Sequence, residues 1–174
     1  MAVVYAQYGK EYSGLAQQFR VTPVSCGNHS HYEEYLKYCA TSDHKTGKGK
    51  TYIILDEETP RIVGFVTLRA SSLIFKDDNL FLGRSAIEIT ELAVDINYEK
   101  QGYGRILVDL ALTIVDTLRN ECLGIEYISL CADPISVPFY VYMGFSKIDD
   151  FYEIPRDGWN NNCIPMALKL PELD

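Results

Sequence analysis

The feature that most constrains the fold is an apolar, strand-like run that leads through a glycine-bearing turn into a long amphipathic segment. The run covers residues 86–94, the turn reads Gln101-Gly102-Tyr103-Gly104-Arg105, and the amphipathic segment spans residues 103–120. Apolar residues recur along that segment at roughly i, i+4, i+8 and i+11, which is the spacing of one helix face. The first N–H groups of such a helix lack intrahelical partners, and the helix dipole there favours negative charge. The sequence therefore predicts an anion cradle of the kind most often used for phosphate.

The remaining segments predict an α+β fold. Strands are expected over residues 3–8, 51–55, 62–68 and 127–131, and residues 145–148 and 165–170 can close the sheet. Helices are expected over residues 31–40, after a capping turn at 26–30, and over about 135–143, where Gly144 ends the helix. Residues 43–50 are expected to form a loop, and residues 71–83 are expected to be irregular. The secondary structure of residues 12–24 is ambiguous from the sequence. This order predicts a mixed, mostly antiparallel sheet with helices on both faces and a parallel strand–helix–strand core.

Length and charge limit the function classes. A chain of 174 residues suits one domain, here expected over residues 1–174. The net charge of −8 argues against generic nucleic-acid binding and leaves cationic or amine substrates open. No apolar stretch approaches the ~18 residues of a membrane span, and the first residues lack a secretory pattern, so we expect a cytoplasmic protein without a membrane partner.

The cysteines and histidines do not predict a disulfide framework or a metal site. The five cysteines are scattered and form no CxxC pair, so we expect reduced thiols. Cys26, His29 and His31 lack a fourth ligand at sensible spacing, which favours a capping turn with exposed histidines over a metal site. The stretch from Thr46 to Thr51 resembles a nucleotide P-loop, but His44 replaces the first glycine and a strand follows, so a basic loop is expected.

Three motifs in order resemble the GNAT superfamily of N-acetyltransferases. They are the strand ending Glu91-Leu92-Ala93-Val94, the loop Gln101-Gly102-Tyr103-Gly104-Arg105, and Phe139-Tyr140-Val141-Tyr142-Met143-Gly144-Phe145. The resemblance implies an acetyl-CoA-dependent N-acetyltransferase that transfers the acetyl group to a primary amine by direct attack on the thioester. It implies coenzyme contacts from the residues of the strand end and the loop, namely Leu92, Ala93, Val94, Lys100, Gln101, Gly102, Tyr103, Gly104 and Arg105.

The resemblance also suggests an acid and a base for acetyl transfer. Tyr140 resembles the family's tyrosine that protonates the coenzyme sulfur, and Tyr142 is the alternative. Glu91 stands where several relatives place a carboxylate facing the amine, and Glu88 or a relay through water is the alternative base. On a regular strand Glu88 and Glu91 lie on opposite faces, so either carboxylate could instead line a solvated face or form a salt bridge.

The loop departs from the family pattern at two positions. The family tends to have Arg or Gln where this chain has Glu99, and often has a glycine where it has Lys100. Glu99 would repel a pyrophosphate unless it points away, or it serves as an acid at the helix N-terminus. Lys100 and Arg105 offer compensating positive charge. These departures keep a non-catalytic coenzyme A-binding sensor open as an alternative.

The N-terminal half is similar to the branch that includes GNAT toxins of toxin–antitoxin pairs. Residues 24–28, the segment with Tyr35 and Leu36, and the strands at 51–54 and 62–66 carry this likeness. It implies an aminoacyl-tRNA acceptor and an antitoxin partner, although the acidic charge favours a small-molecule or protein amine. Tyr152 and Trp159 are expected either in the acceptor pocket or in packing or a subunit contact, which leaves a homodimer open.

Overall fold

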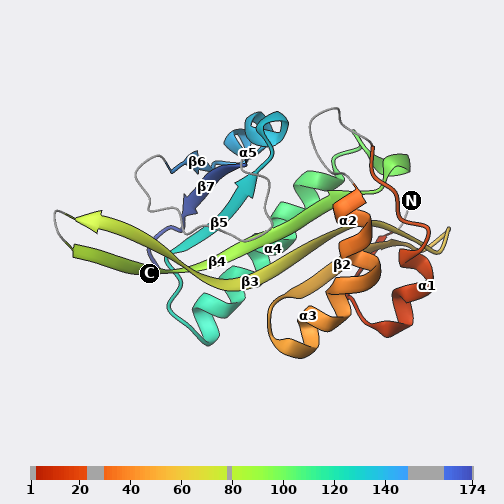
Figure 1. Ribbon diagram of the computed structural model, residues 1–174, viewed down its shortest axis with the longest axis horizontal. Coiled ribbons are helices and arrows are strands. Elements are labelled where there is room, and N and C mark those ends of the chain that lie inside the picture. Colours follow the sequence, from red (N-terminus) through yellow and green to blue (C-terminus); the bar gives the residue numbers. More distant parts are fainter. Residues whose placement is uncertain (1–2, 23–29, 78–79, 149–162, 174) are drawn as a thin grey trace. The chain divides into compact units, whose positions relative to one another are not determined.

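The computed structural model describes residues 3–22, 30–77, 80–148 and 163–173. Its described strands form one seven-stranded sheet in the order β1-β2-β3-β4-β5-β7-β6 (Figure 1). They are β1 (Val3–Gln7), β2 (Lys50–Asp56), β3 (Arg61–Asp77), β4 (Leu80–Val94), β5 (Tyr127–Ala132), β6 (Ser146–Lys147) and β7 (Ile164–Lys169). β4 and β5 run parallel, whereas β1–β2, β2–β3, β5–β7 and β6–β7 are antiparallel. The predicted α+β fold with a mixed, mostly antiparallel sheet is confirmed.

The described helices are α1 (Ser13–Ala16), α2 (Ser30–Glu34), α3 (Ala40–Thr46), α4 (Tyr103–Glu121) and α5 (Val137–Tyr142). Short 3₁₀ helices are η1 (Lys10–Tyr12), η3 (Ile96–Tyr98) and η4 (Pro134–Ser136). A π-helical turn, η2 (Tyr35–Cys39), joins α2 to α3 without a break. The long amphipathic pattern after the glycine turn therefore forms a helix over almost the residues that the sequence predicts.

Contacts within the chain divide it into two compact units. The first comprises residues 1–69 and 90–111, and the second residues 70–89 and 112–174. Both β3 and β4, as well as α4, contribute residues to both units. The single domain over residues 1–174 stays a prediction.

The first unit carries helices on both faces of its strands. Phe65 of β3 is fully buried in a cluster with Phe19, Leu36 and Ile53, which places helical residues on one face. Its neighbour Gly64 faces the other way, since a Cβ added there would lie 2.9 Å from Leu107 Cδ1 of α4 and 2.9 Å from the Ala93 carbonyl oxygen. Burying one such Phe or Leu side chain contributes about 1.5–3 kcal/mol, so this double-sided packing holds β3, β4 and the start of α4 together.

The second unit is organised around β5. Its residues Ile128 and Leu130 are buried, and so are Phe145 and Met166. The parallel ladder with β4 runs from Ala86↔Tyr127 to Ile89↔Leu130. On its other side β5 pairs with β7 along its whole length. In the chain, α5 follows this strand after the short helix η4.

Two loop predictions are wrong. Residues 71–83 are expected to be irregular, but their described part continues β3, where the side chains are mostly half-buried, and β4, where they are exposed. Residues 43–50 are expected to be a loop, but α3 continues to Thr46. Gly47, with φ 74°, ends that helix, and Lys48 N–H donates to the Asp43 carbonyl.

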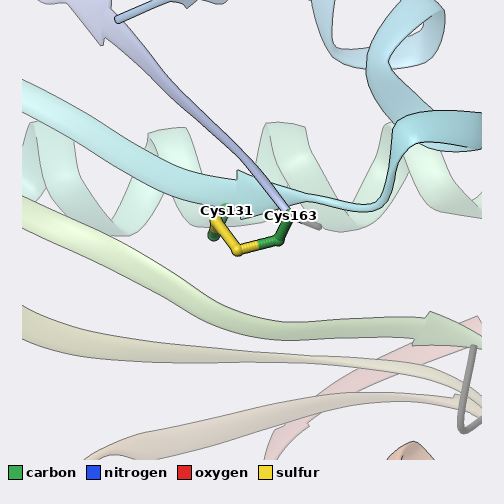
Figure 2. Close-up of a disulfide and its surroundings, with 2 residues drawn as sticks. All are labelled: Cys131 and Cys163. Atoms are coloured by element: carbon green, nitrogen blue, oxygen red, sulfur yellow. A yellow bond between two sulfur atoms is a disulfide. The ribbon is translucent and has the colours of Figure 1, made fainter. Parts of the chain in front are cut away.

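The prediction of reduced thiols is wrong for one pair of cysteines. Cys131 and Cys163 form a disulfide, with their Cα atoms 5.5 Å apart (Figure 2). Cys131 lies in β5 and Cys163 directly precedes β7, so the antiparallel pairing of these strands brings the two together. Cys39 and Cys122 are free and exposed, whereas Cys26 lies outside the described residues. The capping turn at residues 26–30 lies largely outside them too, as do Tyr152 and Trp159.

Candidate active site

The predicted anion cradle lies at the start of α4. Lys100 and Gly102 both have left-handed backbones, with φ 60° and 89°. Ile106 N–H donates to the Gly102 carbonyl at 3.2 Å, which is a helical i→i−4 bond at the very start of α4. The N–H groups of Gly104 and Arg105 come before that bond, at the positive end of the helix, where an α-helix supplies them no intrahelical acceptor and a ligand can bind. The backbone here has the geometry that an anion such as pyrophosphate requires.

Hydrogen bonds and ring contacts with η3 hold the glycine-bearing loop in place. The Asp95 carboxylate accepts hydrogen bonds from the Asn97 N–H and from the Arg20 N–H, both at 3.0 Å. Gln101 Nε2 in turn donates to the Asn97 carbonyl at 3.0 Å. The Tyr98 and Tyr103 rings meet edge to face, with centroids 6.1 Å apart. These contacts order the chain between the end of β4 and α4 before any ligand is bound.

Two charged residues near the loop, Glu99 and Arg105, have protein partners. Glu99 Oε1 accepts a hydrogen bond from Thr22 N–H at 3.3 Å, so this carboxylate is directed at the backbone of residue 22. Arg105 Nε lies 3.7 Å from Asp109 Oδ2, and both side chains are exposed. An exposed pair of this kind contributes only about 0.3–0.5 kcal/mol, so Arg105 can be drawn to a phosphate at little cost.

The end of β4 extends beyond its ladder with β5. The paired residues end at Ile89 and Leu130, whereas β4 continues to Val94. Leu92, Ala93 and Val94 therefore belong to the part of β4 past the parallel pairing. Ala93 is buried in the core of the first unit, and Leu92 and Val94 are half-buried. Their contact with the pantetheine arm stays a prediction.

Both glutamates of β4 are buried. Glu88 is 1% exposed and Glu91 is 6% exposed, so neither lies on a solvated strand face. Glu91 Oε1 lies 3.0 Å from Nε2 of His31, the second residue of α2. The His31 ring also meets the rings of Tyr32 and Tyr35, at centroid distances of 5.6 and 6.4 Å. Sequence reasoning missed this pair, because no spacing pattern connects two residues that lie 60 positions apart.

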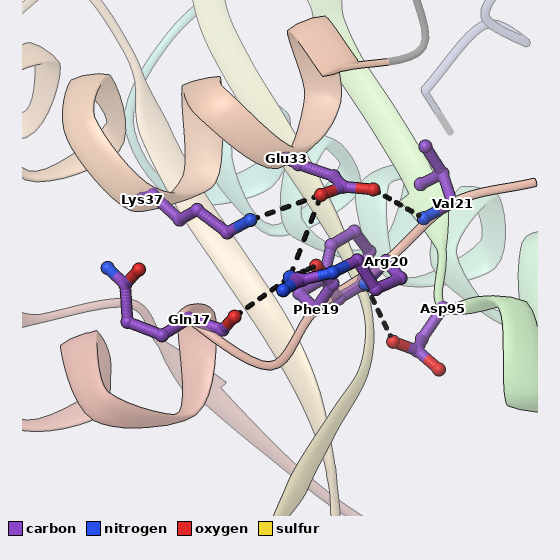
Figure 3. A network of polar contacts seen from close by, with 7 residues as sticks. All are labelled: Gln17, Phe19, Arg20, Val21, Glu33, Lys37 and Asp95. Atoms are coloured by element: carbon purple, nitrogen blue, oxygen red, sulfur yellow. Dashed lines mark hydrogen bonds and ion pairs between the residues drawn. The ribbon is translucent and has the colours of Figure 1, made fainter. Parts of the chain in front are cut away.

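A polar network anchors the helix that carries His31 (Figure 3). Glu33 lies 3.1 Å from Lys37 Nζ and 3.6 Å from the Arg20 guanidinium, and its other oxygen accepts the Val21 N–H at 3.1 Å. The Arg20 backbone is bound to Asp95 at the end of β4 through its N–H, and its carbonyl accepts the Ile96 N–H at 2.8 Å. Segment 20–21 thus connects α2 to the residues that follow Glu91 on the chain.

Tyr140 lies in the second unit, on α5. It is 8% exposed and packs edge to face against Phe139 and Phe145, with centroids 4.9 and 5.8 Å away. Burial, and secondarily the charge of Asp133, raise the pKa of the Tyr140 phenol above its ordinary value. The phenol therefore stays protonated, which is the form that an acid must have. Tyr142, the alternative acid, is 75% exposed.

The sequence profile of the Acetyltransferase (GNAT) family matches residues 13–145 of this chain, well over half its length. The chain belongs to the GNAT family. No curated protein sequence matches it. It is an acetyltransferase, and acetyl-CoA is the co-substrate that this family uses.

Solved structures of similar fold include several GNAT toxins. A bacterial toxin is 20% identical, with a TM-score of 0.75 and coverage of 97% of this chain and 90% of the other. A Tyr-to-Phe variant of AtaT, bound to the C-terminus of the antitoxin AtaR and acetyl-CoA, is 18% identical, with a TM-score of 0.70 and coverage of 96% and 92%. AtaT complexed with acetyl-methionyl-tRNAfMet is 20% identical, with a TM-score of 0.71 and coverage of 98% and 95%. At these identities the likeness shows a shared GNAT fold.

The residues predicted for the site of this GNAT chain belong to different units. Glu91, the end of β4 and the loop from Lys100 to Arg105 belong to the first unit, and Tyr140 belongs to the second. Among the described residues no group of three or more His, Cys, Asp or Glu side chains is arranged to hold a metal ion. In the same part of the chain, no helix has the length and apolar character that crossing a membrane requires.

Proposed function

We propose that this GNAT enzyme acetylates a primary amine by direct attack of the amine on the thioester of acetyl-CoA. The backbone N–H groups at the start of α4 hold the pyrophosphate, and Leu92, Ala93 and Val94 border the pantetheine arm. Tyr140 donates its phenolic proton to the departing sulfur. The observation that carries this proposal is a buried tyrosine in the family's motif, in a chain whose loop geometry suits pyrophosphate.

Proton transfer fits the chemistry of Tyr140. A coenzyme thiolate has a pKa near 8 to 9, as a cysteine thiol does, and an ordinary phenol has a pKa of about 10. A phenol kept neutral by burial reaches its charged form only when the sulfur has taken its proton, so it stabilises the leaving group at the moment when charge develops. The attacking amine must also lose a proton, and this calls for a base on the acceptor side.

The test is acetyl-CoA turnover with a panel of amines, followed by mass spectrometry of the acetylated products. Replacement of Tyr140 by Phe keeps the ring packing and removes the proton, so we expect turnover to fall about 10²-fold while coenzyme affinity is kept. Tyr142→Phe tests the alternative acid and should retain nearly full turnover. Unchanged turnover in Tyr140→Phe would remove Tyr140 from the mechanism.

An aminoacyl-tRNA is the second candidate acceptor. It is supported by the likeness to AtaT, solved with acetyl-methionyl-tRNAfMet, over nearly the whole chain. The α-amino group of an aminoacyl ester is also a weaker base than a lysine amine, since α-amines have pKa values of about 7.7–8.0, so more of it is free to attack near neutral pH. The net charge of −8 opposes tRNA binding, because phosphate contacts dominate nucleic-acid affinity.

A panel containing charged tRNA, uncharged tRNA and small α-amines separates the two acceptors. Acetylated aminoacyl-tRNA together with growth arrest on expression supports the tRNA acceptor, which would also make an antitoxin partner the next protein to seek. Acetylation of small amines alone, with normal growth at high expression of active enzyme, supports the small-molecule or protein amine. A cytoplasmic location and a homodimer stay predictions in either case.

A further inference from the structure

The contact between His31 and Glu91 joins two groups of very different accessibility. The side chain of His31 is 51% exposed, whereas that of Glu91 is 6% exposed, and Nε2 and Oε1 lie 3.0 Å apart. An acceptor amine approaches from solvent, so it can reach the imidazole more readily than the carboxylate. Glu91 is the residue that family resemblance suggests as the base, and the structure gives it a histidine partner.

Basicity also separates the two groups. A carboxylate has an ordinary pKa of about 4.3 and an imidazole of about 6.5, whereas an α-amine has one of about 7.7. The imidazole is therefore the better match to an ammonium that must lose a proton near neutral pH. A carboxylate within hydrogen-bond distance further favours the imidazolium form. Glu91 also fixes which ring nitrogen carries the proton, because Nε2 is the nitrogen directed at it.

The surroundings hold this geometry in place. Glu33 and Arg20 anchor α2 to the chain segment bound to Asp95, a few residues after Glu91 (Figure 3). Among the described residues, the titratable and charged groups on and against this helix are Glu91 from β4, Asp43 from α3, Arg20 beside Glu33, and Tyr32, Glu33, Glu34, Tyr35, Lys37 and Cys39 on the helix itself. Burial first, and then the charges of Asp43, Glu91 and Glu34, raise the pKa of the Cys39 thiol. The charge of Glu91 thus acts on this helix at Cys39 as well as at His31.

We propose that His31 is the group that takes the proton from the acceptor amine, and that Glu91 is a positioning residue that orients the ring and stabilises the imidazolium. The imidazole gains the proton that leaves the ammonium, and the freed lone pair forms the N–C bond to the acetyl carbon. The C–S bond breaks and the sulfur takes the phenolic proton of Tyr140. His31 then passes its proton to water. The attacking nitrogen loses its second proton as the amide forms, and this proton returns the Tyr140 phenolate to the phenol by way of solvent. This inference rests on the amine acetylation proposed above.

The experiment compares kcat/KM as a function of pH for the wild-type enzyme and for His31→Gln, His31→Ala, Glu91→Gln and the control His44→Ala. His44 is an exposed histidine on α3 whose ring lies 3.4 Å from Gln7, and it is not part of the site. We expect His31→Gln, which keeps an N–H donor for Glu91, to lose about 10²-fold in kcat/KM with unchanged melting temperature and coenzyme affinity. We expect free imidazole to restore part of the activity of His31→Ala, and to have no effect on His44→Ala.

Glu91→Gln gives a different signature. It removes the counter-charge and keeps the site's shape, so the acid limb of the pH profile should move to lower pH with a smaller loss of maximal activity. Loss of activity in Glu91→Gln together with near wild-type activity in His31→Gln and His31→Ala would overturn the proposal and make Glu91 the base. Inactive His31 variants that imidazole does not rescue, with an unshifted limb in Glu91→Gln, would overturn it as well.

A wild-type enzyme that acetylates no amine would mean failure of the proposed function. The pair is then tested by following the His31 imidazole by NMR as pH is varied. A titration midpoint that falls in Glu91→Gln, with His44 unchanged, supports the pairing. A midpoint that stays where it was contradicts it.

Discussion

Lys100 has a left-handed backbone, with φ 60°, one residue before the glycine loop proper. An L side chain in this region costs about 1–2 kcal/mol, which glycine avoids. The GNAT pattern often has a glycine here, and the structure gives the reason, because the chain must turn at this residue whatever its side chain. Lys100 therefore keeps a positive charge beside the cradle at a cost in backbone energy.

Replacing Lys100 by Gly should raise the free energy of unfolding by about 1 kcal/mol and weaken coenzyme binding through the lost charge. Lys100→Gln is the matched control, because it loses the same charge but keeps the left-handed requirement. Urea unfolding and calorimetric coenzyme binding measure the two effects separately. Equal stability of the Gly and Gln variants would show that the backbone at this residue is not strained.

At the scale of the elements, a hydrogen bond from Tyr98 to Asp56 connects the end of β2 to η3, immediately before the loop. Burial by itself would raise the pKa of Asp56, but hydrogen bonds from Thr59, Tyr98 and Glu58 outweigh it and lower the pKa below its ordinary value. Burial, followed by the bond to Asp56, raises the pKa of Tyr98 to about 12. Both shifts favour the state in which a neutral phenol donates to a carboxylate.

The sign of each shift sets a pH window. Because the Tyr98 pKa rises from 10.0 to about 12, its stabilising contribution is complete below pH 10 and is lost as pH rises toward 12. Because the Asp56 pKa is lowered from 3.8, its contribution is present above that pH and is lost as pH falls through the folded value. We expect Tyr98→Phe to melt below the wild type from pH 6 to 9, with a gap that narrows at both extremes. A gap that is constant from pH 4 to 11 would contradict this coupling.

Sequence periodicity predicts the elements whose faces differ in burial. The helix α4 has one buried side, and β5 is a short, mostly buried apolar run, so their limits are nearly correct. The outer residues of β3 are mostly half-buried and those of β4, such as Leu82 and Arg84, are exposed, so no alternation of buried and exposed positions identifies them as strands. The continuation of α3 past Ala40 is hidden in the same way by its polar residues.

Some features of the candidate site depend on local sequence, and others depend on contacts between residues that are distant in the sequence. The cradle and Tyr140 lie in short motifs, so the sequence alone is enough to predict them, and their roles stay predictions. Glu91 contacts His31, and Glu99 contacts Thr22. Each partner is distant in sequence and is brought close only by tertiary packing. The pairing of Cys131 with Cys163 likewise depends on strand register, which the spacing of cysteines does not contain.

At the scale of the whole chain, the disulfide closes a loop that includes α5 and Tyr140. Its two cysteines are 32 positions apart, and a cross-link over such a loop stabilises by about 3 to 4 kcal/mol in the chain-entropy account. We expect reduction to lower the melting temperature by roughly 10 °C. Cys131→Ala/Cys163→Ala should melt near the reduced protein and should not respond to reductant.

Thiol counting in denaturant checks the same prediction directly. The untreated protein should show two fewer reactive thiols than the reduced protein. Equal counts in protein isolated under thiol-blocking conditions would mean that the pair is reduced in the cell, as is usual in a reducing compartment. In that case β5 and β7 would still pair, but the disulfide would not contribute to the stability of the protein in the cell.

The π-helical turn between α2 and α3 limits which insertions and deletions this part of the chain can tolerate. In η2 the Ala40 N–H donates to the Tyr35 carbonyl, five residues back, so the turn accommodates one residue more than an α-helix would. Each residue of an α-helix advances the direction of its side chains by about 100°. Deleting one residue from this turn would keep the helix but rotate His31 away from Glu91. The rotation of α2 about its own axis therefore decides whether His31 lies beside Glu91.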